Sequence, residues 1–166
     1  VATALPASVQ SLLTARVDRL AQTDRALLQA ASVIGRRFDP QLLAVAVNYA
    51  DVDGRLAAMQ ALDLVRLETK SGDYEFKHAL LRDALYQGLL SEARAALHEK
   101  VAAEIERRSG NRLTEVAEIL AHHYSQTGNV GKSFAYLAMA GIKSLGVYSL
   151  DDAAIHFAAA LSLLDN

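Results

Sequence analysis

Apolar residues recur every three or four positions along most of this chain, which is the spacing of one face of an α-helix. The first such face begins after Pro6 and Ser8, and a second is expected from an N-cap at Thr23 to Gly35. The inward positions are Val9, Leu12, Leu13, Val17, Leu20, Leu27, Leu28, Ala31 and Ile34. The pattern therefore predicts two amphipathic helices before residue 36.

Two more helices are predicted before the pattern changes. Asp39 as N-cap and Pro40 at the first helical position form one of the clearest start signals in the chain. A fourth helix is expected from about Asp51, and its inward residues are Val52, Leu56, Met59 and Leu62. The first part of the chain is thus a run of short helices.

One stretch has the period of two that is typical of β-strands. The runs LVRLET and YEF, at 64–69 and 74–76, are joined by the turn sequence Lys70-Ser71-Gly72-Asp73. Short helices followed by a two-stranded hairpin are the element order of a winged helix. Because an isolated hairpin is marginally stable, it must pack against the helices.

After His78 every segment has helical spacing. One helix is expected to run to about Leu90. A second, capped by Ser91, is expected to end at RSGNR (108–112), and its seam is formed by Leu97, Val101 and Ile105. The next helix is expected from a Thr114 N-cap to Gly128-Asn129. Two more are expected over Lys132–Gly146 and over Leu150–Leu164. Ser149 and Asp152 are placed like a capping box at the start of the last one. The second half is therefore predicted to be entirely α-helical.

The last two helices carry a spacing of small and aromatic residues. Gly141, Ala153, Phe157 and Ala160 are separated by the offsets that a tetratricopeptide repeat requires of its glycine, alanine, phenylalanine and alanine. The small residues would let the two helices touch, and the aromatic ring would fill the groove between them. Since one repeat cannot bury its own face, we expect the chain to end where an array of repeats begins.

The composition supports helices and excludes several classes of site. Hydrophobic residues make up 52% of the 166 residues, and there is no cysteine, so disulfides and thiolate chemistry are excluded. The net charge is −2, and the first 80 residues carry as many basic as acidic side chains, unlike a nucleic-acid-binding surface. With neither a signal peptide nor a membrane-length apolar run, and with Val1 in place of Met, we expect a cytoplasmic domain from a longer protein.

In order and spacing, these segments resemble the C-terminal part of the ATPase module of STAND-type signalling proteins, especially bacterial regulators with a class III adenylate/guanylate cyclase domain. The resemblance rests on LPASVQSLLTARVDRLAQTDRALLQAASVIGRRFD, YEFKHALLRDALYQGLL, AEILAHHYSQTGN and AYLAMAGIKSLGVYSLDDAAIHFAAALSLLD. It implies a winged-helix regulatory subdomain over 1–90, a linking helical hairpin over 91–130 and a first tetratricopeptide-like repeat over 131–166.

The same resemblance implies a role for His78. In STAND ATPases a histidine at the start of the helix after the wing reaches the β-phosphate of bound ADP, so His78 is the candidate nucleotide sensor of the full-length protein. The residues expected to pack around it are Tyr74, Phe76, Leu81, Leu85 and Tyr86. Plant disease-resistance ATPases have Met-His-Asp at this place, whereas this chain has Ala79 after the histidine. On spacing alone, His78 could equally be a structural cap or close the hairpin.

No catalytic or cofactor site is expected within the chain itself. It lacks a G-x-x-x-x-G-K-[ST] loop, so we expect no enzyme activity in this chain. We expect ADP or ATP with Mg²⁺ to bind only in the full-length parent, an ATPase that could also be a cyclase. His122-His123 are expected to be one packed and one solvated ring and not a metal site. Arg36-Arg37 after Gly35 could meet a phosphate or an acidic partner, although two adjacent arginines in a loop are more often solvated. Further residues given a structural interpretation are His98, His156, Asp51, Asp53, Asp151 and Asp152.

The expected function is therefore regulatory. The winged helix would latch an upstream ATPase core in the same chain, and the helical repeats would bind a protein partner. DNA binding is disfavoured, because the helix at 51–64 has Arg55 as its one basic residue among several aspartates. Two alternatives stay open: a transcription regulator that binds DNA, and a scaffold that binds a protein whatever the nucleotide state. No membrane association is expected.

Overall fold

The computed structural model describes residues 15–164, which are mostly helical with one small antiparallel sheet. The mostly α prediction is therefore confirmed. The chain divides into two compact units, the first ending at Arg94 and the second beginning at Ala95. The predicted start of the first helix at Ser8, with Val9, Leu12 and Leu13, lies outside the described residues.

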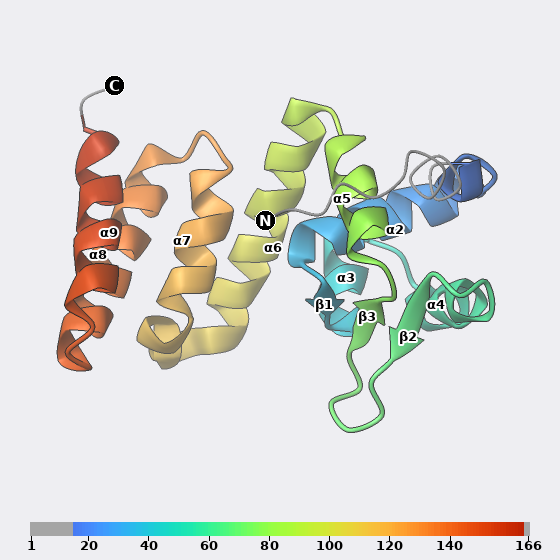
Figure 1. Cartoon of the computed structure of the whole chain (residues 1–166), viewed down its shortest axis with the longest axis horizontal. Helices are drawn as coiled ribbons and strands as arrows, with labels where there is room; N and C mark the ends of the chain where they lie inside the picture. Colours follow the sequence, from blue (N-terminus) through green and yellow to red (C-terminus); the bar gives the residue numbers. More distant parts are fainter. Residues whose placement is uncertain (1–14, 165–166) are drawn as a thin grey trace. The chain divides into compact units, whose positions relative to one another are not determined.

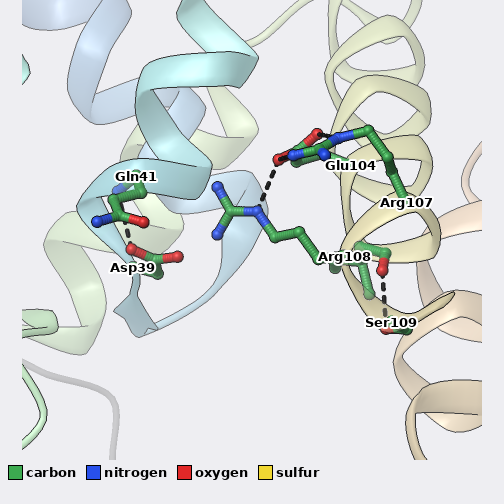
Figure 2. Close-up of polar contacts among 7 residues, drawn as sticks. Asp39, Gln41, Glu104, Arg107, Arg108 and Ser109 are labelled. Atoms are coloured by element: carbon green, nitrogen blue, oxygen red, sulfur yellow. Dashed lines mark hydrogen bonds and ion pairs between the residues drawn. The ribbon is translucent and has the colours of Figure 1, made fainter. Parts of the chain in front are cut away.

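Four helices surround the core of the first unit: α2 (Gln22–Ile34), α3 (Pro40–Val47), α4 (Val52–Ala61) and α5 (Ala79–Gln87) (Figure 1). The start of α3 is as predicted, since Asp39 accepts a hydrogen bond of 2.8 Å from the Gln41 N–H (Figure 2). The predicted Thr23 cap is wrong. Helix α2 begins two residues earlier with Ala21 as its N-cap, and the Thr23 hydroxyl instead accepts a hydrogen bond from Arg55.

The sheet has three strands, β1 (Arg37–Phe38), β2 (Val65–Leu67) and β3 (Tyr74–Phe76), in the order β1-β3-β2 (Figure 1). The predicted hairpin of β2 and β3 is confirmed. Strand β1 was not predicted, because a strand of two residues is too short to show a period. All neighbouring strands are antiparallel, and β3 lies in the middle.

The core of the first unit combines one sheet face with the inward faces of the helices. Its largest fully buried side chains are Leu28, Val33, Phe38, Leu43, Leu56, Leu64, Phe76, Leu81 and Leu85. Val52, Leu56 and Met59 are buried as predicted. The prediction for Leu62 is wrong: α4 ends at Ala61, so Leu62 is the C-cap and its exposed fraction is 53%.

The second unit is built from α6 (Ser91–Ser109), a 3-10 segment η1 (Gly110–Val116), α7 (Ala117–Ser125), α8 (Val130–Gly146) and α9 (Leu150–Ser162). Helix α6 already begins at the end of the first unit. Ser91 is its first residue and not the predicted cap. Near its C-terminus, Glu104 accepts hydrogen bonds from Arg107 and Arg108 (Figure 2).

Two further predicted helix ends in this unit are wrong. Thr114 lies inside η1, so α7 begins at Ala117 after Val116. Asn129 does not close α7; its side chain accepts a 3.1 Å hydrogen bond from the Lys132 N–H and thereby starts α8 at Val130.

Ser149 is the N-cap residue of α9, but the capping box is absent. Its hydroxyl donates to the Asp152 carboxylate at 2.5 Å and accepts no bond from a backbone N–H. Helix α9 also ends at Ser162, two residues before the predicted end.

Helices α8 and α9 lie side by side (Figure 1), and they carry the four residues with repeat-like spacing. Ala153 and Ala160 are buried, with exposed fractions of 2% and 3%. Gly141 faces the Phe157 ring, and a Cβ on this glycine would lie 2.7 Å from the ring. The expected close approach of two helices around small residues is therefore present.

Candidate functional site

His78 lies at the junction between β3 and α5, where the backbone changes from extended to helical. The Lys77 N–H donates to the Leu64 carbonyl at 3.1 Å, which carries the β2–β3 pairing one residue past β3. His78 is still extended, with φ −126° and ψ 120°, and its carbonyl accepts from the Leu81 N–H at 3.0 Å. The His78 backbone therefore belongs to the first turn of α5.

The His78 side chain is exposed and does not cap α5. This is at odds with the alternative in which the ring serves as a helix cap. The expected packing residues hold the backbone beneath it: Tyr74, Phe76, Leu81 and Leu85 are buried. Tyr86 is half-buried and stacks with the guanidinium groups of Arg82 and Arg94, each 5.1 Å from the ring centroid.

Asp63 lies next to this junction and pairs with Lys77. Its backbone is left-handed, with φ 63°, and is fixed by a 3.0 Å hydrogen bond from its N–H to the Gln60 carbonyl. The hydrogen bond from Lys77 lowers the pKa of the Asp63 carboxyl. Electrostatic interactions with His78 and Arg16 lower this pKa further.

A cavity of about 250 Å³ opens beside Asp63, and its lining residues are Arg16, Arg19, Leu20, Leu62 and Leu64. We call this cavity, with Lys77 and His78, the basic pocket. The cavity lining combines three leucines with two arginines. Lys77 adjoins it through its backbone hydrogen bond to Leu64. Such a pocket can pair with an oxyanion and cover an apolar or flat group next to it.

Sequence reasoning did not find Arg16 and Arg19 as members of this site. They precede α2, about 60 residues before His78, and their signal in the sequence is limited to two arginines at helical spacing. Only the fold brings them to the turn between α4 and β2. His78, Lys77 and the leucines after α4 are close in sequence to the hairpin and could be located from it.

The histidines of the second unit form a cluster that is not a metal site. His123 is buried and His122 is exposed, as predicted. His98 is also buried, and its Nδ1 lies 2.8 Å from the His123 Nδ1, so one ring donates and the other accepts. Burial lowers the pKa of His123 to about 3. Among residues 15–164, no three His, Asp or Glu side chains are arranged to hold a metal ion.

A polar network joins α6, α7 and α8. The Glu106 carboxylate accepts hydrogen bonds from Tyr124 (2.7 Å), Lys132 (2.6 Å) and Tyr136. Burial alone would raise the pKa of Glu106, but the hydrogen bonds from Lys132 and the two tyrosines outweigh it and lower the pKa. The two tyrosine rings stack at 5.5 Å. These hydrogen bonds link side chains of three helices and so fix their packing.

The remaining candidate residues have structural partners. Arg36 pairs with Glu75 at 3.0 Å, and Arg37 belongs to β1. Asp151 and Asp152 lie in the first turn of α9, where the helix dipole favours them. Arg55 of α4 bonds to Tyr49, Thr23 and Asp24. His156 is half-buried on α9.

Within the described part of the chain, no helix is both long and apolar enough to cross a membrane. Comparisons with protein-family models, curated proteins and solved structures find no match to this chain.

Proposed function

We propose that this chain is a regulatory and interaction segment of a multidomain signalling ATPase. The first unit is a winged helix that latches a nucleotide-bound ATPase core upstream in the same chain. The second unit leads into tetratricopeptide repeats that bind a protein partner, and the output is a nucleotide cyclase. His78 is the nucleotide sensor of the latch.

The basic pocket is the observation that carries this proposal. His78 is exposed next to Lys77, its ring caps no helix, and Arg16 and Arg19 line the cavity with Leu62 and Leu64. Asp63 pairs with Lys77, and Lys77, His78 and Arg16 all lower its pKa. A phosphate brought to the basic pocket by a neighbouring ATPase core would pair with groups that are already in place.

The element order also supports a winged helix. Within the described residues, α2, α3 and α4 precede the β2–β3 hairpin, and β1 completes a three-stranded sheet from the segment between α2 and α3. The close packing of Gly141 against Phe157 supports the repeat assignment in the same way. Both assignments rest on geometry, and neither by itself determines a function.

The DNA-binding alternative has less support. Helix α4 precedes the hairpin and would be the recognition helix, but the guanidinium of its one basic residue, Arg55, is hydrogen-bonded to Tyr49 and Asp24. Reading bases would require several donors directed into a groove. Salt-dependent binding of duplex DNA by this chain would favour this alternative.

The test uses the parent protein, after the gene upstream of Val1 has been sequenced. A P-loop and a Walker B strand within about 300 residues, the span of one or two domains, are expected there. His78→Ala in that protein should release bound ADP faster, whereas His122→Ala, an exposed histidine on α7, should release it at the wild-type rate. Unchanged ADP retention in the His78→Ala protein would rule out the sensor role.

A pull-down with and without ADP separates the latch from the scaffold. If the repeats are controlled by the latch, the amount of captured partner changes with nucleotide in the parent protein, and His78→Ala abolishes that change. If capture is the same in every nucleotide state, the chain is a scaffold and the latch proposal is wrong.

A further inference from the structure

The outer face of the three-stranded sheet carries a row of charged residues. Glu75 on the central strand is opposite Arg37 on β1 and Arg66 on β2. Cross-strand neighbours point to the same side of a sheet, so the three side chains share one face. Phe38 and Phe76 occupy the opposite face, where their ring centroids lie 5.4 Å apart in the core.

Glu75 holds two of the surrounding arginines in place. Its Oε1 lies 3.0 Å from Arg36 Nε, and its Oε2 lies 2.8 Å from Arg66 Nη2. The Arg36 backbone is fixed as well, since its carbonyl accepts from the Phe76 N–H at 2.9 Å. Two guanidinium groups are thus oriented by one carboxylate on the rigid part of the sheet.

The arginines remain accessible although they are paired. The Glu75 side chain is only 10% exposed, whereas the side chains of Arg36 and Arg66 are 63% and 59% exposed. Each guanidinium meets Glu75 along part of its edge and presents the remainder to solvent. We call Arg36, Arg37 and Arg66 the arginine face; with Glu75 between them, its net charge is +2.

The chemistry of this face favours carboxylates from a protein partner. Arginine forks match the geometry of carboxylates, and fixing them beforehand reduces the entropy lost on binding. The acidic side chain of Glu68 acts on Arg66 and limits the positive area. A phosphodiester backbone requires a longer positive track than this.

We infer that the arginine face docks an acidic protein segment, whose aspartate or glutamate carboxylates pair with Arg36, Arg37 and Arg66. This interaction is independent of the proposed function, because the arginine face shares no residue with the basic pocket. The two sites can therefore be tested separately in the same chain.

The binding experiment uses a fluorescein-labelled peptide of alternating aspartate and glutamate, titrated with this chain and followed by fluorescence anisotropy. Binding should weaken as the salt concentration rises from about 50 to about 300 mM. Arg36→Gln with Arg66→Gln should weaken binding about tenfold, since two exposed ion pairs are lost and Glu75 is uncovered. Arg112→Gln with Lys100→Gln removes the same charge elsewhere and should change binding less than about twofold.

A second pair of variants controls for folding. Arg36→Lys with Arg66→Lys keeps both charges next to Glu75 and should fold as the wild type, as checked by circular dichroism. It loses the guanidinium forks, so its affinity should lie between those of the wild type and the glutamine pair.

The site is located by ¹⁵N-resolved NMR with the unlabelled peptide. The largest amide shifts are expected at 36–38, 65–67 and 74–76. Shifts centred on Arg16, Arg19 and Lys77 would overturn the inference, because the peptide would then occupy the basic pocket. Equal binding by the glutamine pair and the wild type, or tighter binding of a random duplex DNA than of the peptide, would overturn it as well.

Discussion

The Phe157 ring occupies the space that a side chain at Gly141 would take. A Cβ at position 141 would lie 2.7 Å from Cε1 and 2.8 Å from Cζ of this ring, which is closer than packed carbon atoms approach. The contact joins α8 to α9 at a buried point. It defines the spacing between the last two helices, and it makes glycine the residue that permits their close packing.

Gly141→Ala should therefore destabilise the second unit by about 2 kcal/mol, because the ring must move out of a packed position. Gly146→Ala is the matched control on the same helix: a Cβ there meets no atom within 4 Å, so stability should stay the same or rise by up to about 1 kcal/mol. Urea denaturation followed by circular dichroism measures both. If Gly141→Ala unfolds at the wild-type midpoint, the Phe157 contact does not determine the helix spacing.

The buried His98–His123 pair predicts a loss of stability in acid. Burial lowers the pKa of His123 from 6.5 to about 3. Between these two pH values the His123 ring is protonated in the unfolded chain and neutral in the folded chain. Stability is then complete above the unfolded pKa and is lost as the pH falls toward 3. The loss from this one ring should reach about 2 kcal/mol between about pH 7 and about pH 5.

Urea denaturation at both pH values measures this effect. His123→Leu should flatten the pH dependence, while His122→Gln, which changes an exposed ring, should leave it as in the wild type. An equally steep dependence in the His123→Leu protein would assign the titration to other groups.

His78→Ala should leave the stability of this chain within about 0.5 kcal/mol of the wild type, because an exposed side chain without a capping bond contributes little to folding. Asn129→Ala is the positive control, since it removes the side-chain cap of α8 and should cost about 1 kcal/mol. Thermal unfolding compares the two. A loss for His78→Ala as large as that for Asn129→Ala would make His78 a structural residue.

The Glu106 network should be sensitive to loss of its central carboxylate. Glu106→Ala leaves Tyr124, Tyr136 and Lys132 without their carboxylate and should cost about 2 kcal/mol or more. Tyr136→Phe removes one of the three hydrogen bonds and should cost about 1 kcal/mol. Tyr148→Phe, at a ring that is 91% exposed, is the neutral control. Equal losses for Glu106→Ala and Tyr136→Phe would show that the network does not act as a unit.

Local signals predicted much of the fold. The Asp39-Pro40 start of α3, the turn between β2 and β3, and the inward faces of α2 and α4 follow from residues a few positions apart, whose preferences act within one element. The helix ends were less predictable. Thr23 and Thr114 resemble caps in sequence, but a bond from Arg55 and the 3-10 segment before α7 use these positions differently.

The candidate site was only partly predictable. The position of His78 between strand and helix follows from the change of period at that residue, whereas the placement of Arg16 and Arg19 at the turn after α4 depends on how the chain folds back. The pairing of β1 with β3 likewise joins two segments about 40 residues apart and has no local signal.

Local patterns thus predict most of the helical segments, the turn of the hairpin and the small residues at 141, 153 and 160 that accompany Phe157. The tertiary structure alone decided which charged and titratable groups meet: His98 with His123, Glu106 with Lys132, and Arg36 with Glu75. The physical reason is that periodicity and capping report interactions within one element. A contact between distant segments is fixed only when the core places their backbones side by side.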